Sequence, residues 1–332
     1  MDFINKLTLY TQEGKLPLEI FETLNRFYSS YVEAIQANQG EITKYIPLLN
    51  QFLDLAVEQL REPYIFGLYH QSIRSPFDFY RFGLEFIRPL IKLDASRIEG
   101  INHADEIMSY LASGDNVILF ANHQTEPDPQ AISLLLEKTH PKLAEEIIFI
   151  AGQRVVTDPL ATPFSKGRNL LCIYSKNYID HPPELKHQKL AHNQRTMKVM
   201  KKLLGEGRKC IYVAPSGGRD RLSSEGRLEV APFDAQSVEM FRLMAEHSTQ
   251  RTHFYPLALA TFDLLPPPHT VQMSIGEPRH ASCTPIHLAF GSEIDMHNIP
   301  GIDHSNKDMR RKLGTEHIWR RVCEEYQKIR RR

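Results

Sequence analysis

Apolar side chains recur at helical spacing through the first 75 residues. They stand three or four positions apart in two stretches: Ile20, Leu24, Phe27, Tyr28 and Tyr31, then Ile46, Leu49, Phe52, Leu53, Val57 and Leu60. This period places the apolar residues on one face of a helix. Gly14 and Gly40 interrupt the pattern and mark turns. We predict a small all-helical domain over residues 1–75, without a strand, followed by a second domain over residues 76–332.

From about residue 115 the pattern changes to short apolar runs of strand length. These runs cover residues 116–121, 147–151, 170–174, 209–214, 253–260 and 271–275. Amphipathic helical patterns fall between or after them, over residues 130–138, 184–204, 234–246 and 307–332. Strands that alternate with helices are typical of parallel sheets. The second domain is therefore predicted to be α/β, with a mainly parallel central sheet covered by helices.

Polar residues follow four of these runs directly. His123 follows the first, Gln153 and Arg154 the second, Lys176 and Asn177 the third, and residues 216–221 the fourth. In open α/β sheets, ligands bind beyond the carboxyl ends of the strands. If the strands are parallel, these four groups meet in one pocket.

Charge and composition narrow the classes of partner. Lys plus Arg and Asp plus Glu each number 40, so there is no global positive field for nucleic acid. No stretch approaches ~20 apolar residues, the length of a spanning helix. The segment 307–332 holds 10 basic and 4 acidic side chains. It is read as a surface helix packed on the core, or as a contact for an acidic partner or an anionic membrane surface.

The four cysteines and the N-terminus bear on cellular location. Cys172, Cys210, Cys283 and Cys323 form no Cys-x-x-Cys pair, which disfavours zinc and redox motifs. Cys172 and Cys210 lie in apolar runs and are interpreted as buried thiols in a reducing compartment. The first residues lack a signal-peptide pattern and the composition of a transit peptide. We expect a soluble cytoplasmic protein, in the bacterial cytosol or, as a trimmed mature form, in the plastid stroma.

His123 and Asp128 are the candidate catalytic pair. Pro127 and Pro129 exclude a continuous helix between them, so the pair spans a bent loop. Asp128 could simply be the N-cap of the helix that follows. It could also accept a hydrogen bond from His123 Nδ1, which would leave Nε2 to take a proton from an alcohol.

The candidate anion site is Ser216-Gly217-Gly218-Arg219-Asp220-Arg221. Two glycines after a strand allow backbone N–H groups to converge on an anion, and Arg219 and Arg221 can clamp phosphate oxygens. An ordinary polar turn with a surface ion pair remains the alternative. Arg168 and Lys176 are further candidate cations, each also readable as a solvated charge.

Several other motifs are missing from the sequence. There is no Gly-x-Ser-x-Gly elbow, no Walker loop and no His-Glu-x-x-His pair, which disfavours an α/β-hydrolase, a P-loop nucleotide site and a zinc protease. The segment 205–210 approaches a dinucleotide motif, but it lacks the last glycine and precedes a strand. We expect no metal and no cofactor.

These residues resemble a known family. Asn122-His123-Gln124-Thr125-Glu126-Pro127-Asp128 is similar to the His-x4-Asp signature of glycerolipid acyltransferases. Longer strings resemble the soluble, plastid-type glycerol-3-phosphate acyltransferases: FIAGQRVVTDPL (149–160), PFSKGRNLLCIYS (163–175), APSGGRDR (214–221), APFDAQSV (231–238) and YPLALA (255–260). The resemblance is clear over residues 100–290, and several motifs occur in the family's order.

The resemblance implies acyl transfer to the sn-1 hydroxyl of glycerol 3-phosphate, the first step of phospholipid synthesis. The donor would be a thioester on acyl carrier protein or coenzyme A. By position, His123 is the base, Asp128 its partner, and Arg219 and Arg221 bind the substrate phosphate. The family's Lys-His pair is replaced here by Asn177 and Tyr178, so Lys176 is expected to supply that part of the phosphate wall.

The oxyanion environment and the partners are less defined. Asn122, Ser216, Gly217, Gly218 and Arg168 are candidates for contact with the substrate or the oxyanion, and backbone N–H groups near Pro129 or Gly217 could be donors. The tail helix or residues 138–142 could face an acidic carrier protein. Three alternatives stay open: acylation of lysophosphatidate at sn-2, a non-catalytic anion-binding or carrier-binding module, and a phosphoester hydrolase.

Overall fold

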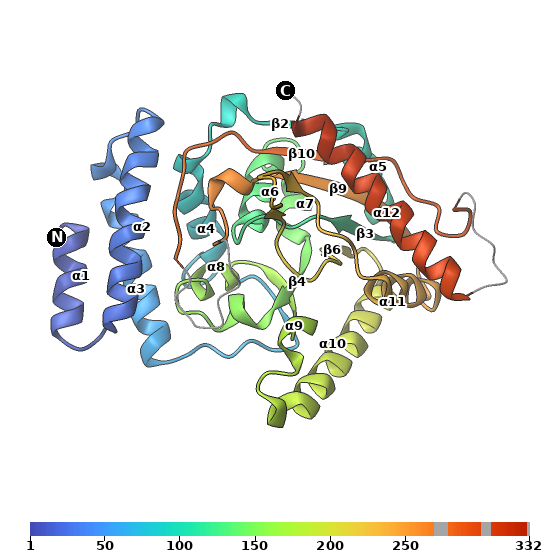
Figure 1. Cartoon of the computed structure of the whole chain (residues 1–332), viewed down its shortest axis with the longest axis horizontal. Helices are drawn as coiled ribbons and strands as arrows, with labels where there is room; N and C mark the ends of the chain where they lie inside the picture. Colours follow the sequence, from blue (N-terminus) through green and yellow to red (C-terminus); the bar gives the residue numbers. More distant parts are fainter. Residues whose placement is uncertain (269–277, 300–306, 331–332) are drawn as a thin grey trace.

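The computed structural model of the protein describes residues 1–268, 278–299 and 307–330. Its centre is an eight-stranded sheet with the strand order β1-β5-β4-β6-β3-β9-β10-β2 (Figure 1). The strands are β1 (Tyr69–His70), β2 (Arg97–Glu99), β3 (Asn116–Ala121), β4 (Ile148–Gly152), β5 (Asn169–Ile173), β6 (Cys210–Val213), β9 (Thr252–Ala260) and β10 (His287–Phe290). β7 (Arg221–Leu222) and β8 (Leu228–Glu229) form a separate hairpin.

The middle of the sheet is parallel. β5, β4, β6, β3 and β9 pair in parallel with their neighbours. β1 joins one edge antiparallel to β5, and β10 pairs antiparallel with β9. The carboxyl ends of β3, β4, β5, β6 and β9 therefore lie along the same edge of the sheet.

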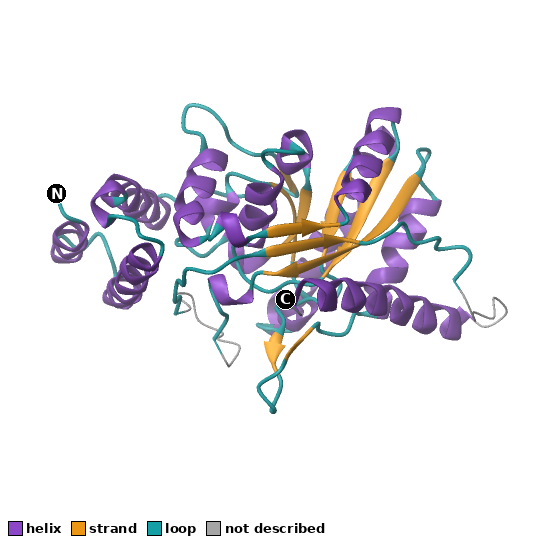
Figure 2. Ribbon diagram, turned by 90° about the horizontal axis from the view of Figure 1, so that it is seen from above, coloured by secondary structure: helices purple, strands orange, loops and turns teal. Residues whose placement is uncertain are grey.

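Helices cover both faces of the sheet (Figure 2). One face packs against α5 (Ile101–Ser113), α6 (Asp128–Leu136) and α7 (Pro141–Glu146), and the other against α10 (Lys186–Glu206), α11 (Ala235–Glu246) and α12 (Lys307–Arg330). β3 is buried throughout, with Val117 and Leu119 in the first core and Ile118 and Phe120 in the second. Strands buried on both faces are continuous apolar runs because successive side chains enter opposite cores.

The N-terminal helices form a layer beside this sandwich (Figure 1). They are α1 (Phe3–Gln12), α2 (Leu18–Ala37) and α3 (Ile46–Arg61), and they share one apolar core with α4 (Phe79–Ile87) and α8 (Thr162–Ser165). The ring of Phe86 lies 5.1 Å from the rings of both Phe52 and Phe164. The helical layer is thus packed directly on the α/β part.

Short elements complete the chain. They are α9 (Lys176–Ile179) and the 3₁₀ turns η1 (Ile42–Lys44), η2 (Arg88–Leu90), η3 (Leu93–Ala95), η4 (Gln153–Val156), η5 (Pro183–Leu185) and η6 (Phe262–Leu264). Within the described residues, no helix is long and apolar enough to cross a membrane.

The predicted fold class and helical N-terminal region are confirmed. Five of the six expected strands occur within one residue of their expected bounds, and the sixth, 271–275, lies outside the described residues. The expectation of no strand in residues 1–75 is wrong at Tyr69–His70, which pairs with β5. Two residues give no periodicity, so this edge strand carries no pattern signal. The division of the chain into domains at residue 75 stays a prediction.

Candidate active site

The loop from Asn122 to Pro127 joins the end of β3 to α6 and carries the candidate base. His123 Nδ1 lies 2.7 Å from Asp128 Oδ2. The histidine side chain is 31% exposed, whereas that of Asp128 is 1% exposed. The imidazole therefore reaches solvent from one side while its orienting carboxylate is buried beneath it.

Asp128 does not cap the helix that follows it. It is the first residue of α6, after Pro127, and its carboxylate turns back toward the loop. The alternative interpretation of Asp128 as the N-cap of this helix is therefore wrong. Oδ2 also accepts from the backbone N–H of Gln124 at 2.8 Å. Oδ1 accepts from the backbone and hydroxyl of Thr125 at 3.2 and 3.0 Å, and from the hydroxyl of Thr261 at 2.6 Å.

These bonds keep Asp128 ionised. Burial alone would raise the pKa of its carboxyl group, but the hydrogen bond and charge of His123, with the bonds from Thr261 and Gln124, hold the pKa below its usual value. A carboxylate that accepts several hydrogen bonds is stabilised in its charged form. Asp128 thus fixes the histidine with Nδ1 as donor, which leaves Nε2 as the proton acceptor.

A second buried carboxylate, Asp220, ties the Ser216–Arg221 loop to the His123 loop. Its Oδ2 accepts from Asn122 Nδ2 at 2.8 Å and from Gln124 Nε2 at 3.3 Å. Its Oδ1 accepts from the backbone N–H of Ala231 at 2.9 Å, and its own N–H donates to the carbonyl of His123 at 2.6 Å. Burial raises the pKa of Asp220. The candidate base and the candidate anion site are therefore held together, although they are about a hundred residues apart.

Asn122 is a structural part of this network. Its side chain bonds both the N–H and the carbonyl of Leu259 on β9, at 2.7 and 3.0 Å. The hydroxyl of Tyr212 on β6 donates to its backbone carbonyl at 2.6 Å. Asn122 is fully buried, so in this structure it holds the end of β3 against both neighbouring strands.

Cationic side chains surround Glu126 in the same loop. Arg279 is bound to both oxygens of Glu126, at 2.8 and 3.2 Å, and to Asp158 at 2.9 Å. Burial would raise the pKa of Glu126, but the charges of Arg279, Arg219 and Arg154 together hold it below its usual value. Arg219 and Arg154 therefore lie close to the His123 loop. That the polar groups after β3, β4, β5 and β6 meet in one pocket stays a prediction.

The other candidate anion ligands lie at the same edge. Arg221 donates to the carbonyl of Pro268. Lys176 Nζ is exposed and bound to Asp234 at 2.5 Å and to Gln236 at 3.1 Å. Its charge is therefore partly neutralised by a carboxylate.

The two glycines differ in what they offer. Gly217 has a left-handed φ of +69°, a conformation that favours glycine. Its N–H donates to the carbonyl of Ala214 at 3.2 Å, so this donor is already engaged. The hydroxyl of Ser216 bonds the carbonyl of Gly218 at 2.9 Å. Gly217 and Gly218 have open space where a side chain would stand, which leaves room for a ligand beside the turn.

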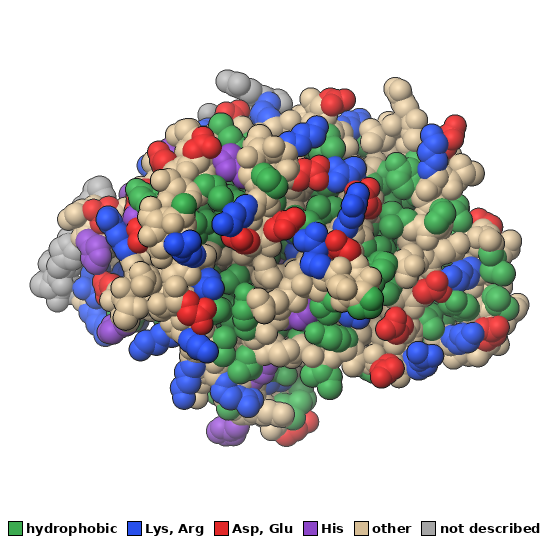
Figure 3. Space-filling model, turned by 180° about the vertical axis from the view of Figure 1, so that it is seen from behind, with side chains coloured by type: hydrophobic (Ala, Val, Ile, Leu, Met, Phe, Trp, Pro, Cys, Tyr) green, Lys and Arg blue, Asp and Glu red, His purple; other side chains and the backbone are tan. Residues whose placement is uncertain are grey.

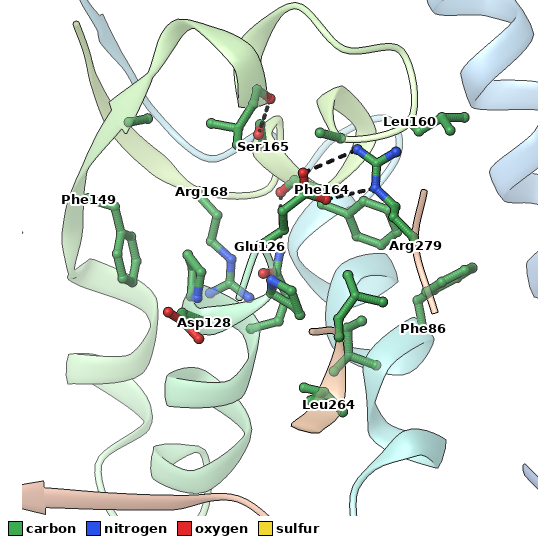
Figure 4. Close-up of a pocket in the computed structure, with 18 of the residues that line it drawn as sticks. Phe86, Glu126, Asp128, Phe149, Leu160, Phe164, Ser165, Arg168, Leu264 and Arg279 are labelled. Atoms are coloured by element: carbon green, nitrogen blue, oxygen red, sulfur yellow. Dashed lines mark hydrogen bonds and ion pairs between the residues drawn. The ribbon is translucent and has the colours of Figure 1, made fainter. Parts of the chain in front are cut away.

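An apolar cavity opens at the catalytic pair (Figure 4). Its volume is about 180 Å³, and His123, Glu126 and Asp128 form part of its wall. Most of the lining is apolar and comes from the helical layer as well as from the sheet: Leu24, Phe27, Phe52, Phe86, Phe149, Leu160, Phe164, Leu170 and Leu264. An apolar pocket with a few polar groups at one side is the usual form of a small-molecule site.

Arg168 is a buried cation in this wall. It is 3% exposed and points into the pocket (Figure 4). Its Nη1 donates to the hydroxyl of Ser133 at 2.6 Å, and its guanidinium lies 4.8 Å from the ring centre of Tyr80. Burial lowers the pKa of Arg168 to about 10. Its Nε has no hydrogen-bond acceptor within the described residues.

Three contributors to the site were not found from the sequence. Thr261, Gln124 and Arg279 bond the catalytic or acidic groups of the His123 loop. Thr261 directly follows β9, so the strand-end rule applied to the fifth run would have found it.

In the chain as far as it is described, no group of three or more His, Cys, Asp or Glu could hold a metal ion.

Comparisons with known proteins identify relatives of the chain. The family model described as Acyltransferase matches residues 102–260. A chloroplastic glycerol-3-phosphate acyltransferase of Cucurbita moschata is 40% identical over 319 residues, which are 95% of this chain and 69% of that protein. The chloroplastic glycerol-3-phosphate acyltransferase of Arabidopsis thaliana is 35% identical over 329 residues, which are 98% and 72% of the two chains.

Among solved structures, the chain resembles the 1-acyl-sn-glycerophosphate acyltransferase of Thermotoga maritima. The TM-score is 0.42 and the identity 16%, over 85% of this chain and 97% of that one.

The α/β fold, the His–Asp pair and the matched model define an acyltransferase. Because relatives of 35–40% identity align over nearly all of the chain, it belongs to the family of glycerol-3-phosphate acyltransferases.

Proposed function

We propose that the protein transfers a fatty acyl chain from a thioester to the sn-1 hydroxyl of glycerol 3-phosphate. The observation that carries this proposal is the His123–Asp128 pair in the wall of an apolar cavity. The cavity can take the acyl chain, and the pair can activate an alcohol beside it. The relatives, which are named for this activity, support the choice of substrate.

In this mechanism His123 acts as general base and then as general acid. Nε2 removes the proton of the sn-1 hydroxyl while the oxygen attacks the thioester carbonyl carbon. The carbon–sulfur bond then breaks, and the imidazolium gives the proton to the leaving sulfur, which departs as a thiol. Asp128 stabilises the imidazolium between the two steps. Such catalysis contributes ~10²–10⁴-fold to the rate.

The substrate phosphate is proposed to dock against Arg219 and Arg221, with Lys176 at the outer edge. Arg219 lies close enough to the His123 loop to lower the pKa of Glu126. This charge effect supports a cation on the same side of the site as the base, as a phosphorylated three-carbon alcohol requires. A guanidinium binds phosphate through paired hydrogen bonds. Asn177 and Tyr178 stand where the family has its Lys-His pair, so fewer cations follow Lys176 here.

Arg168 is proposed to contact the acyl donor. Its buried guanidinium points into the apolar cavity, and its Nε lacks an acceptor among the described residues. A thioester carbonyl or the tetrahedral oxyanion would supply one.

The proposed donor is a thioester of acyl carrier protein, with coenzyme A thioesters as the alternative. No metal or cofactor takes part in the proposed reaction. A membrane surface is the proposed destination of the amphiphilic product, and a location in the cytosol or plastid stroma stays a prediction.

The test is a two-acceptor assay with both donors. Purified enzyme is expected to release thiol and to form 1-acylglycerol 3-phosphate with glycerol 3-phosphate, but not to acylate lysophosphatidate. His123→Ala should lose nearly all turnover while it still folds, as judged by circular dichroism. A His123→Ala enzyme with wild-type turnover would remove the base from the mechanism, and acylation of lysophosphatidate alone would change the acceptor.

A further inference from the structure

The sequence of α10 contains an unusual run of positive charge. From Lys186 to Gly205 it holds six Lys or Arg residues and no Asp or Glu, although the whole chain has 40 of each sign. Five of the six cations are exposed: Lys186, Arg195, Lys198, Lys201 and Lys202. The sixth, Lys189, is buried and bonds the carbonyl of Tyr178 at 2.8 Å.

Three of these cations form one stripe. Arg195, Lys198 and Lys202 follow each other at helical spacing on the side of α10 opposite Met200 and Leu203, which are buried in the core. Within the described residues, none of the three pairs with a carboxylate. Like charges three and four positions apart repel each other and destabilise a helix. The stripe therefore opposes helix stability, which favours a binding role for these cations.

An apolar groove runs beside the stripe. Met240, Leu243 and Met244 of α11 supply its apolar lining, and the polar lining residues are Lys201, Gln236, Glu239, His247 and Arg311. Methionine is common on surfaces that receive other proteins because its side chain adapts to their shape. Figure 3 shows Lys and Arg side chains gathered over the lower left of the molecule, the region of α10.

This surface is continuous with the rim of the active site. Lys176, a candidate phosphate ligand, bonds Gln236, which itself lines the groove. In α10, the side chain of Asn193 bonds the backbone of Tyr174 just beyond β5. The ring of His192 bonds the carbonyl of Cys172 in β5. The first turns of α10 therefore lie beside the carboxyl edge of the sheet, and its later turns, which carry the stripe, run toward the amino end of β3, where Asn116 donates to the carbonyl of Leu204 at 2.8 Å.

The other basic segments are less suited to an acidic partner. Half of the cations of α12 are paired within that helix, as Arg311–Asp308, Arg320–Glu316, Arg321–Glu324 and Lys328–Glu325, and Arg310 lies 3.7 Å from Glu239 of α11. Lys138 and Lys142 are flanked in the sequence by Glu137, Glu145 and Glu146.

We propose that α10 and the α11 groove form the docking surface for an acidic, helical carrier protein that brings the acyl thioester. Acidic side chains of the carrier face Arg195, Lys198 and Lys202, and an apolar strip of the same helix enters the groove. This inference rests on the proposed acyl transfer. A coenzyme A thioester, which carries no protein, does not need the surface.

The experiment compares the double charge reversal Lys198→Glu/Lys202→Glu with the matched control Lys138→Glu/Lys142→Glu. All four positions are exposed, so both variants should melt at the wild-type temperature. The α10 variant should raise the KM for acyl-carrier-protein thioesters about tenfold, because the charge pairs that steer the partner become repulsive. The kinetics of the α10 variant with acyl-coenzyme A should match those of the wild type. The control variant should match the wild type with both donors. Salt should raise the wild-type KM for the carrier thioester but not that of the α10 variant.

The results separate the two proposals. Equal KM values for the carrier thioester in the wild type and the α10 variant would overturn the docking surface. So would an equal loss with both donors, or use of acyl-coenzyme A alone by the wild type. Failure of the wild type with every thioester would instead overturn the proposed function. Sedimentation with anionic phosphatidylglycerol vesicles is expected to be the same for both variants. Its loss in the α10 variant, with an unchanged KM, would assign the surface to a membrane and overturn the carrier site.

Discussion

At the scale of single residues, Asp128 is the group whose replacement is most informative. The two oxygens of its carboxylate accept five hydrogen bonds. In Asp128→Asn one oxygen becomes an NH₂ group that faces at least one backbone N–H and leaves it unpaired, at a cost of about 1–3 kcal/mol. An amide donor toward His123 Nδ1 would also move the ring proton to Nε2, where the base is needed.

We therefore expect Asp128→Asn to unfold more easily by about 2 kcal/mol and to lose ~10²–10⁴-fold in kcat. Urea unfolding and steady-state kinetics measure the two effects. Thr125→Val is the matched control: it removes one hydroxyl donor to Oδ1 but leaves the contact with His123 intact. Asp128→Asn with the wild-type kcat would show that the carboxylate does not orient the base.

The pH dependence of stability follows from the same residue. The folded pKa of Asp128 lies below its ordinary value of 3.8, so the unfolded chain binds the proton more readily. Its contribution is complete above the unfolded pKa and is lost as pH falls through the folded pKa. The difference in unfolding free energy between the wild type and Asp128→Asn should be constant from pH 7 to about pH 5 and shrink below pH 4. A difference that grows on acidification would contradict the assigned direction.

The sequence predicted some residue roles and missed others, for physical reasons. The roles predicted for His123, Asp128 and Arg219 came from the rule that strand ends gather polar groups at one edge of the sheet. Asp220 lies between the two candidate phosphate arginines in sequence, yet it bonds Asn122, Gln124 and the Ala231 backbone. Which of several nearby donors a carboxylate takes depends on tertiary distances, which neither periodicity nor motif spacing contains.

At the scale of elements, parallel strands and their helices were predictable, whereas the cavity was not. Runs buried on both faces give β3 to β6 a continuous apolar signal. β1, β2 and β10 have two to four residues, too few for a period. The cavity lining combines Leu24 of α2 and Phe52 of α3 with Leu170 of β5. Core and cavity positions look the same in a sequence because both are apolar.

A larger side chain in the part of the cavity wall that α2 supplies should change the selectivity for acyl-chain length. Thr23 is 4% exposed and lines the cavity from the side of the helical layer. Thr23→Phe would fill part of that space, so kcat/KM should fall about tenfold or more for an 18-carbon donor and change little for a 10-carbon donor. Ser29→Phe, on the exposed side of the same helix, is the matched control and should leave the ratio of the two donors unchanged. An equal loss with both donors would place the acyl chain elsewhere.

At the scale of the whole molecule, the question is whether the helical layer and the α/β part unfold together. Helices α1 to α3 share a core with α4 and α8 rather than closing on a core of their own. The hydroxyl of Tyr31 in α2 donates to the carbonyl of Phe86 in α4 at 2.8 Å, with both residues buried. Separating the layers would expose these aromatic side chains to water, which couples the two parts energetically.

We therefore expect a single unfolding transition that responds to substitutions in either part. Leu53→Ala in α3 and Ile118→Ala in β3 remove fully buried side chains, and each should lower the stability of the whole by about 2–5 kcal/mol. Calorimetry on both variants measures this, with the exposed Leu18→Ala as control. If the helical layer were an independent domain, Leu53→Ala would shift an early transition and leave the later one in place. If the shared core governs unfolding, both substitutions shift the same peak. The acyl cavity, which both parts line, would then be lost in the same transition, so enzyme activity should disappear with that peak.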